Sequence, residues 1–283
     1  KKNMNPEEKE TRIPSGLPGR NWYDRLNLLN ILVILFLFLT IFSGKNLLQD
    51  NRPADVMAGV RYFLKKFFPP DFSDFPLILD SLGETFQIAI VSTFIAVNLS
   101  LIIALAASRN ISPIWLVQLT RMFLNITRTL PSLIWAFLFV IFFGPTPIAG
   151  VCALTFYSLG YLGKFFSESF ESMDIKVARG LKLIGANPIQ AFLYGLWPNV
   201  KAQVWSHSLW MLEYNIRSAS IIGLVGAGGI GMELNKAMEM ASGFQKVTTI
   251  LICILVIVIF LDLLGQAIRR WITQKINPKS ISD

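Results

Sequence analysis

Residues 176–199 read K-V-A-R-G-L-K-L-I-G-A-N-P-I-Q-A-F-L-Y-G-L-W-P-N, and this small and polar segment interrupts a very apolar chain. Apolar residues recur at helical spacing in its first half, which predicts a short helix. Gly185 is expected to end that helix, because glycine adopts the left-handed conformation without a steric penalty. Asn187 and Pro188 are expected to begin a second helix, as N-cap and first helical residue. The segment therefore predicts two short helices that meet at a corner, and we call residues 176–199 the hook.

Each predicted helix of the hook has one apolar face. Val177, Leu181 and Ile184 share a face of the first helix, with basic residues on the other side. Pro198 is expected to end the second helix. The apolar face of that second helix consists of Ile189, Phe192, Leu193 and Leu196. Such a hook could be only a loop between two membrane helices, so that alternative stays open.

The composition is that of an integral membrane protein. Of the 283 residues, 53% are hydrophobic and 16% are charged, whereas an average soluble protein has about 25% charged residues. The formal net charge of +8 fits a cytoplasmic membrane surface better than a nucleic acid. Cys152 and Cys253 each lie in an apolar run, and His207 is the one histidine. We therefore expect no disulfide and no metal site.

Apolar segments along the chain predict six membrane helices, at residues 26–43, 81–107, 130–143, 148–166, 204–225 and 247–268. Residues 1–25 are then a polar cytoplasmic tail, and residues 269–283 a cytoplasmic C-terminus. Residues 26–80 comprise the first membrane helix and an outer loop, with an amphipathic helix at 56–68. Most lysines and arginines fall on the inner side, as the positive-inside rule requires. The sequence thus predicts an all-α polytopic membrane protein with both termini in the cytoplasm.

Two short patterns make local predictions about the membrane helices. Ser81 and Glu84 have the spacing of a capping box, so Ser81 is expected to begin the second membrane helix and Glu84 to cap it. Gly160 and Gly163 predict that the fourth membrane helix packs closely against a neighbour.

Charged residues within the fifth predicted span are the strongest candidates for function. Glu213 and Arg217 are four residues apart, so they share a helix face and can pair. A charge at mid-bilayer costs about 2.5–3.5 kcal/mol on insertion scales. The pair is therefore either a self-neutralising contact at a helix interface or the polar lining of a path in which Arg217 attracts an anion. Asp262 in the sixth span is expected to be structural.

Residues 226–231 read G-A-G-G-I-G, which matches G-x-G-x-x-G literally. A dinucleotide site needs a strand before this motif, and here a membrane span precedes it, so we reject that interpretation. A glycine-rich break at a helix end instead predicts a re-entrant turn or gate formed by Gly226, Gly228, Gly229 and Gly231. The sequence contains no G-x4-G-K-[ST] motif, so we expect no ATP hydrolysis of the P-loop type in this chain.

Several motifs in order resemble the phosphonate-importer branch of the ABC importer permeases. Residues 213–231 are similar to that branch's pattern E-x-N-x-R-S-A-x-x-x-G-x-V-G-A-G-G-I-G. R-T-L-P-S-L-I-W-A-F-L-F-V at 128–140 and G-x-L-G-K-x3-E-x2-E at 160–171 agree as well. In the hook, Gly185 and Pro198 have the spacing of the family signature E-A-A-x3-G-x9-I-x-L-P, although its Glu-Ala-Ala is replaced here.

The resemblance covers about residues 81–268 and implies the type I ABC importer permease fold, with a coupling loop at 168–200. It implies two copies of the chain, two cytoplasmic ATPase subunits that carry ATP and Mg²⁺, and an external substrate-binding protein in a bacterial inner membrane. It implies no cofactor and no catalysis in this chain. The residues implied to couple to the ATPase are Ala178, Arg179, Gly180, Leu181, Gly185, Ala186 and Asn187.

The implied substrate is a phosphonate or a related phosphorus oxyanion such as phosphite or phosphate, moved by alternating access. The residues expected along the translocation path are Glu213, Asn215, Arg217, Ser218, Pro131 and Ser132. An importer of the same type for methionine or a quaternary amine is an alternative, and so is an ATP-independent secondary transporter, although we see no inverted repeat.

Overall fold

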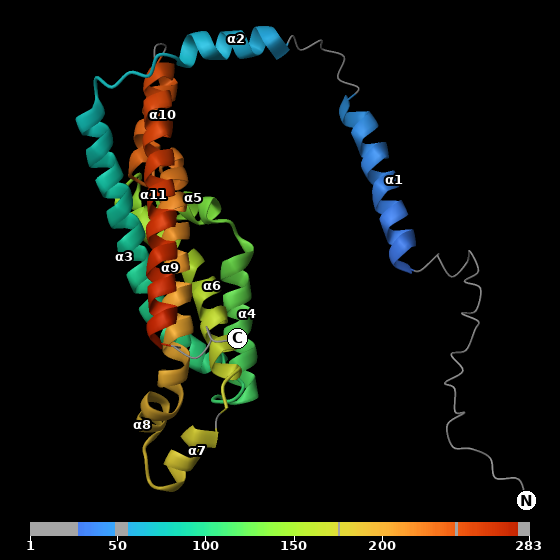
Figure 1. Ribbon diagram of the computed structural model, residues 1–283, viewed down its shortest axis with the longest axis vertical. Helices are drawn as coiled ribbons and strands as arrows, with labels where there is room; N and C mark the ends of the chain where they lie inside the picture. The colour runs from blue at the N-terminus through green and yellow to red at the C-terminus, as the bar shows by residue number, and fades with distance from the viewer. Residues whose placement is uncertain (1–27, 49–55, 175, 241–242, 277–283) are drawn as a thin grey trace, which may run out of the picture. The chain divides into compact units, whose positions relative to one another are not determined.

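Every secondary-structure element in the described part of the chain is a helix, as the sequence predicts. The structure is a computed structural model, and it describes residues 28–48, 56–174, 176–240 and 243–276 (Figure 1). The predicted polar tail at residues 1–25 lies outside these ranges. The chain divides into two units, Lys1–Arg61 and Tyr62–Asp283, and the second unit contains the helical bundle.

The first unit contains α1 (Leu28–Leu48), which extends the predicted first span towards the C-terminus. Its side chains at residues 31–39 are apolar on all sides, which suits a helix in contact with lipid. The helix α2 (Val56–Phe67) confirms the helix predicted at residues 56–68. From Tyr62 on, α2 belongs to the second unit, where the ring of Phe67 lies edge-on to Phe244 with centroids 5.2 Å apart.

Four long helices form the body of the second unit: α3 (Phe75–Ala107), α6 (Pro147–Glu171), α9 (Trp197–Ile222) and α11 (Phe244–Ile276). They run side by side in Figure 1, and α6 packs along both α3 and α9. Large side chains between them are fully buried, among them Leu162, Phe166, Phe170 and Met211. Close packing of these apolar side chains holds the helices together.

Three helices are long and apolar enough to cross a membrane, namely Phe75–Ala107, Pro147–Glu171 and Phe244–Arg270. A fourth span is added if α4 (Ile114–Thr129) and α5 (Ser132–Phe143) are counted as one broken span. The apolar part of α1, Asn30–Lys45, is shorter than these. The helix α9 has 26 residues, but charged residues interrupt its apolar character. Length and composition of the described helices thus support three or four of the six predicted spans.

The second predicted span begins earlier than its capping box suggested. The helix α3 starts at Phe75, and Pro76 lies in its first turn, where no backbone N–H partner is needed. Ser81 is buried inside this helix, so the predicted capping box of Ser81 and Glu84 is wrong. Ile78 is 3% exposed, which shows that the residues before Ser81 already belong to the packed bundle.

The third predicted span is broken into two helices. Much of the segment between the second and third predicted spans is the helix α4, which meets α5 at 91°. Pro131 explains the break, because a proline disfavours the helical conformation at the residue before it. Leu130 is accordingly extended, with φ −89° and ψ 131°. The indole Nε1 of Trp135 donates to the Thr127 carbonyl oxygen at 3.0 Å and holds the bend.

The glycines of α6 pack against α4, as their spacing predicts. A Cβ added at Gly160 would lie 2.5 Å from Thr127 Oγ1 and 3.1 Å from the backbone nitrogen of Arg128. A Cβ added at Gly163 would lie 2.7 Å from Cδ2 of Leu124. The close approach of α4 and α6 therefore depends on residues without a side chain.

Gly160→Ala is expected to lower the thermal unfolding midpoint of the detergent-purified protein, because the new methyl group forces α4 away from α6. The cost of such overpacking is about 1–3 kcal/mol. Gly83→Ala is the matched control: no atom lies within 4 Å of its added Cβ, so its midpoint should not fall. Equal midpoints for Gly160→Ala and the wild type would contradict the close approach.

Candidate functional site

The hook has the corner that the sequence predicts. Its first helix is α7 (Lys176–Leu183), and its second begins as α8 (Pro188–Ala191). Gly185 between them has a φ of 97°, which confirms the left-handed turn. Asn187 Oδ1 accepts a hydrogen bond from the Gln190 backbone N–H at 2.7 Å, and the Asn187 N–H donates to Gln190 Oε1 at 3.0 Å. This capping box confirms Asn187 as the N-cap of α8.

A small-residue contact closes the inside of the hook. Ala178 of α7 is 7% exposed and packs with Leu181 against Ala191. A Cβ added at Gly195 would lie 2.8 Å from Ala178 Cα, so this approach requires glycine. Of the predicted coupling residues, Ala178 and Leu181 thus hold the hook together from inside.

The outside of the hook is apolar. Val177 and Ile184 are 55% and 81% exposed, so they do not share a packed face with Leu181. The exposed apolar side chains of the hook are Val177, Leu183, Ile184, Ile189, Leu193 and Tyr194. A cavity of 380 Å³ lies beside them, with Arg179, Lys182, Ile189 and Asn110 in its lining. An exposed apolar surface of this kind is typical of a protein interaction site.

The hook continues directly into the next long helix. The chain passes from α8 through a π-helical turn (Phe192–Leu196) into α9 without an intervening loop. Pro198 lies in the first turn of α9, so the prediction that it ends a helix is wrong. A proline is tolerated there because the first turn of a helix has no acceptor for its missing N–H.

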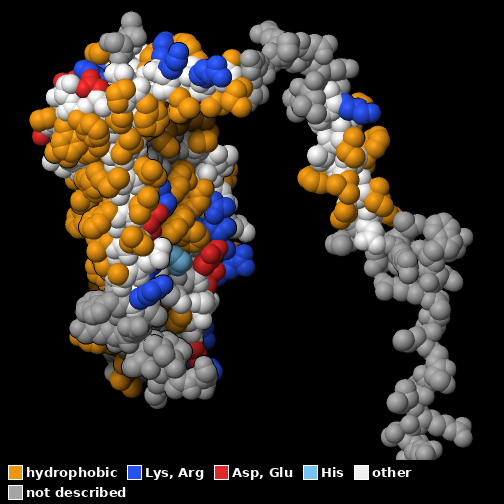
Figure 2. All heavy atoms as spheres, turned by 45° about the horizontal axis from the view of Figure 1, so that its top comes forward, with side chains coloured by type: hydrophobic (Ala, Val, Ile, Leu, Met, Phe, Trp, Pro, Cys, Tyr) orange, Lys and Arg blue, Asp and Glu red, His pale blue; other side chains and the backbone are white. Residues whose placement is uncertain are grey.

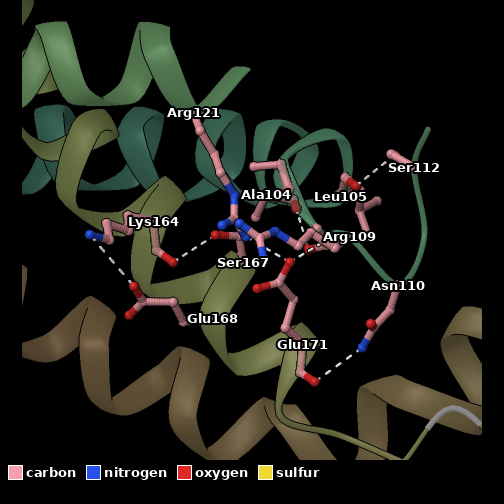
Figure 3. A network of polar contacts seen from close by, with 12 residues as sticks. Ala104, Leu105, Arg109, Asn110, Ser112, Arg121, Lys164, Ser167, Glu168 and Glu171 are labelled. Carbon is pink, nitrogen blue, oxygen red and sulfur yellow. Dashed lines mark hydrogen bonds and ion pairs between the residues drawn. The ribbon is translucent and has the colours of Figure 1, made fainter. Parts of the chain in front are cut away.

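A polar network joins three helices at the hook end of the bundle (Figure 3). Glu171 Oε1 accepts from the Arg109 backbone N–H and from an Arg121 guanidinium nitrogen, each at 2.6 Å. The Arg121 Nε also donates to the Ala107 carbonyl oxygen at 3.0 Å. Asn110 Nδ2 donates to the Glu171 carbonyl oxygen at 3.0 Å. The ends of α3 and α6 are therefore tied to each other and to the middle of α4, a role that the E-x2-E spacing alone did not reveal.

Two ion pairs cross from α9 to α11. Glu213 Oε1 lies 2.8 Å from an Arg269 guanidinium nitrogen, and Arg217 lies 3.4 Å from Asp262 Oδ2. The predicted pairing of Glu213 with Arg217 is therefore replaced by contacts with the neighbouring helix. Gly265 makes room for the Glu213 carboxylate, which would collide with any side chain there. Asp262 is the partner of Arg217 in the structure, and its structural role stays a prediction.

Asn215 lies at the junction of three helices. It is fully buried, and its Nδ2 donates to Thr93 Oγ1 on α3 at 2.9 Å and to Ser158 Oγ on α6 at 2.8 Å. Ser218 is 6% exposed on the same helix. Of the other predicted path residues, Pro131 and Ser132 lie at the bend between α4 and α5, where Pro131 is exposed.

The glycine-rich turn precedes α10 (Ile230–Glu239) at the opposite end of the bundle from the hook (Figure 1). Gly226, Gly228 and Gly229 have φ values of 90°, 85° and 71°, so the turn needs glycine at these positions. Gly223 and Gly231 approach each other so closely that a Cβ on Gly223 would lie 2.6 Å from Gly231 Cα. The predicted turn is confirmed, and its role as a gate stays a prediction.

Side chains of α3 cap this turn. Glu84 Oε2 accepts from the Gly229 backbone N–H at 3.1 Å, and Thr85 Oγ1 accepts from the Ile230 N–H at 2.8 Å. Glu84 is therefore a cap, but for α10 and not for its own helix. Its negative charge also suits the positive end of the α10 dipole.

Comparison with known proteins settles the family. The family model described as the inner membrane component of binding-protein-dependent transport systems matches residues 97–278. The chain belongs to this family. The phosphite transport system permease protein PtxC of Stutzerimonas stutzeri is 33% identical over 94% of this chain and 95% of its own length. The phosphate-import permease protein PhnE of Mycolicibacterium smegmatis is 31% identical over 72% of this chain and 38% of its own.

A solved structure shares the fold of the permease. The inward-facing MetNI methionine ABC transporter matches 72% of this chain and 99% of the compared chain, with a TM-score of 0.62 and 20% sequence identity. The predicted type I ABC importer permease fold is thereby confirmed at the level of the helical architecture. A permease of this family is not catalytic, carries no cofactor, and works with an ATPase and a substrate-binding protein.

Arg217→Ala and Asp262→Ala are each expected to destabilise the permease, because each leaves one charge without its partner. The double variant should recover part of the loss, with a coupling energy of about 0.5–3 kcal/mol for groups in contact. The measurement is the thermal unfolding midpoint of the four proteins. Strictly additive losses would show that the contact contributes no stability.

Glu84→Ala is expected to lower the midpoint as well, because it removes the acceptor of the Gly229 N–H. Loss of a helix cap costs about 0.5–2 kcal/mol. Asp80→Ala, an exposed acidic position on the same helix, is the matched control and should change the midpoint little. Similar midpoints for the two variants would argue against the cap.

Proposed function

We propose that this permease imports phosphite, a phosphonate or a closely related phosphorus oxyanion. The observation that carries the proposal is the similarity to PtxC, which extends over 94% of the chain and includes the bundle, the hook and the glycine turn. PtxC is named as a phosphite transport permease, and further relatives are named for phosphonate transport. The methionine transporter structure, at 20% identity, supports the shared fold and not a shared substrate.

The working complex in this proposal contains two copies of the chain, two cytoplasmic ATPases and an external binding protein. Both termini and the hook face the cytoplasm, and the chain crosses the membrane six times. The exposed apolar side chains of the hook dock on the ATPase, with Arg179, Gly180 and Ala186 at the contact. This orientation agrees with the excess of lysine and arginine on the hook side.

The direct connection of the hook with α9 suggests how ATP drives transport. A shift of the docked hook moves α9, because no flexible loop separates them. The Asn215 contacts and the ion pairs to α11 carry that movement to α3, α6 and α11. Alternating access then follows from two packings of the same helices, with the glycine turn as the gate at the far end.

The decisive experiment reconstitutes the permease with its ATPase in liposomes and adds the binding protein. Phosphite, a phosphonate, phosphate and methionine are supplied in turn, and ATP hydrolysis and uptake are measured. Stimulation and uptake with a phosphorus oxyanion alone would support the proposal. Stimulation by methionine, or uptake without ATP, would contradict it.

Gly185→Val is expected to uncouple the ATPase, because a β-branched residue is strained at a φ of 97° and distorts the corner of the hook. ATP hydrolysis should no longer respond to the loaded binding protein. Gly185→Asn is the matched control, because asparagine tolerates the left-handed region and should keep most of the response. Normal coupling in Gly185→Val would remove the hook from the mechanism.

A further inference from the structure

Most basic side chains along the bundle are paired with carboxylates. The pairs within 4.0 Å are Arg121–Glu171, Lys164–Glu168, Arg217–Asp262, Lys236–Glu233, Lys246–Asp74 and Arg269–Glu213. Arg128 on α4 has no carboxylate within that distance among the described residues. Arg109, Lys201 and Arg270 also have no such side-chain pair in that part of the chain, but they lie near the hook ends of α3, α9 and α11. A charge without a counter-ion inside the membrane is costly, so its presence indicates function.

Arg128 lies near the middle of the bundle's length. Its guanidinium carbon is 5.6 Å from the centre of the Tyr161 ring on α6. Tyr161 is ten residues from Glu171, at the hook end of α6, and fourteen from Pro147, at the other end. At about 1.5 Å per residue, the ring is about 15 Å from the hook end, which is half of a hydrocarbon core about 30 Å thick.

The contact with Tyr161 orients the guanidinium without using its hydrogen-bond donors. An arginine over an aromatic ring is held by its charge and its flat face, so the N–H groups at its edge stay free. Those donors match the oxygens of a phosphorus oxyanion, which arginine binds with two parallel hydrogen bonds. Tyr157 lies 4.9 Å from Tyr161 and 5.1 Å from Tyr214 between ring centroids, so two further tyrosines lie beside the ring that Arg128 contacts.

Arg128 is partly exposed beside a row of aromatic rings. Arg128 and Tyr161 are half-buried, and Phe165 continues the aromatic row of α6 to His207 on α9, with ring centroids 5.0 Å apart. Figure 2 shows charged side chains of both signs near the pale blue histidine, on a face otherwise covered by hydrophobic side chains. The break at Pro131 follows within a turn, and helix ends inside a membrane require a polar or water-filled space for their unpaired backbone groups.

We infer that Arg128 is the intramembrane binding residue for the transported oxyanion, and this inference rests on the function proposed above. The anion leaves the binding protein, meets the guanidinium edge between α4, α6 and α9, and moves on when the helices repack. Arg217 does not take this role, because Asp262 neutralises it. Arg128 is thus the specificity-determining charge of the path, and Tyr161 positions it.

The test compares Arg128→Gln and Arg128→Lys in the complete complex, reconstituted in liposomes with phosphite and the binding protein. Arg128→Gln should lower the maximal uptake rate by about tenfold or more, because the loss of hydrogen bonds to a charged group changes an equilibrium or rate by about that factor. The phosphite concentration for half-maximal uptake should change little, because the binding protein captures the substrate first. Arg128→Lys should retain more uptake, because it keeps the charge. Lys164→Gln removes a cation that is already paired and should leave uptake nearly unchanged.

Other outcomes separate the inference from the proposed function. Wild-type rates in Arg128→Gln would overturn the inference and leave the phosphite function standing. A loss of assembly or thermal stability that parallels the loss of uptake in both variants would also overturn it, because Arg128 would then be structural. A wild-type complex that moves no oxyanion at all would overturn both.

Discussion

The side-chain amide of Asn215 is the interaction on which the bundle depends. It has no exposed surface, and it reaches Thr93 on α3 and Ser158 on α6 from its place on α9. A buried amide without partners is costly in an apolar interior, so these hydrogen bonds hold the three helices in the relative position that the structure shows. Apolar packing alone would allow the helices to slide or rotate against each other.

At both ends of the bundle, hydrogen bonds to polar side chains also join helices that are distant in the sequence. At the hook end, Glu171 collects donors from Arg109 and Arg121 and so joins α3, α4 and α6. At the far end, Glu84 and Thr85 of α3 accept the first N–H groups of α10. In each case a polar group that would be costly in lipid is paired between helices distant in sequence. The satisfied groups specify the arrangement, while apolar packing provides most of the cohesion.

Glycine decides how closely the elements approach. Gly160 and Gly163 bring α4 against α6, Gly195 brings the π-helical turn of the hook against α7, and Gly265 leaves room for a carboxylate. The same residue type forms the corner of the hook and the turn before α10 through its left-handed backbone. Glycine thus determines both the close contacts between helices and the two sharp turns of the permease.

The sequence by itself determined the features that arise within a few residues. The corner at Gly185, the Asn187 cap, the glycine turn and the close packing of Gly160 follow from backbone preference and side-chain size, and each was predicted. The motifs around residues 213–231 were sufficient to indicate the family.

Only the tertiary structure decided which distant groups meet. Glu213 and Arg217 share a helix face, yet each pairs with α11, because Arg269 and Asp262 come close only once the helices have packed. Glu84 caps a helix far along the chain for the same reason. The spacing of residues in the sequence predicts contacts within one helix. The partner of a buried charge instead depends on which helix packs beside it.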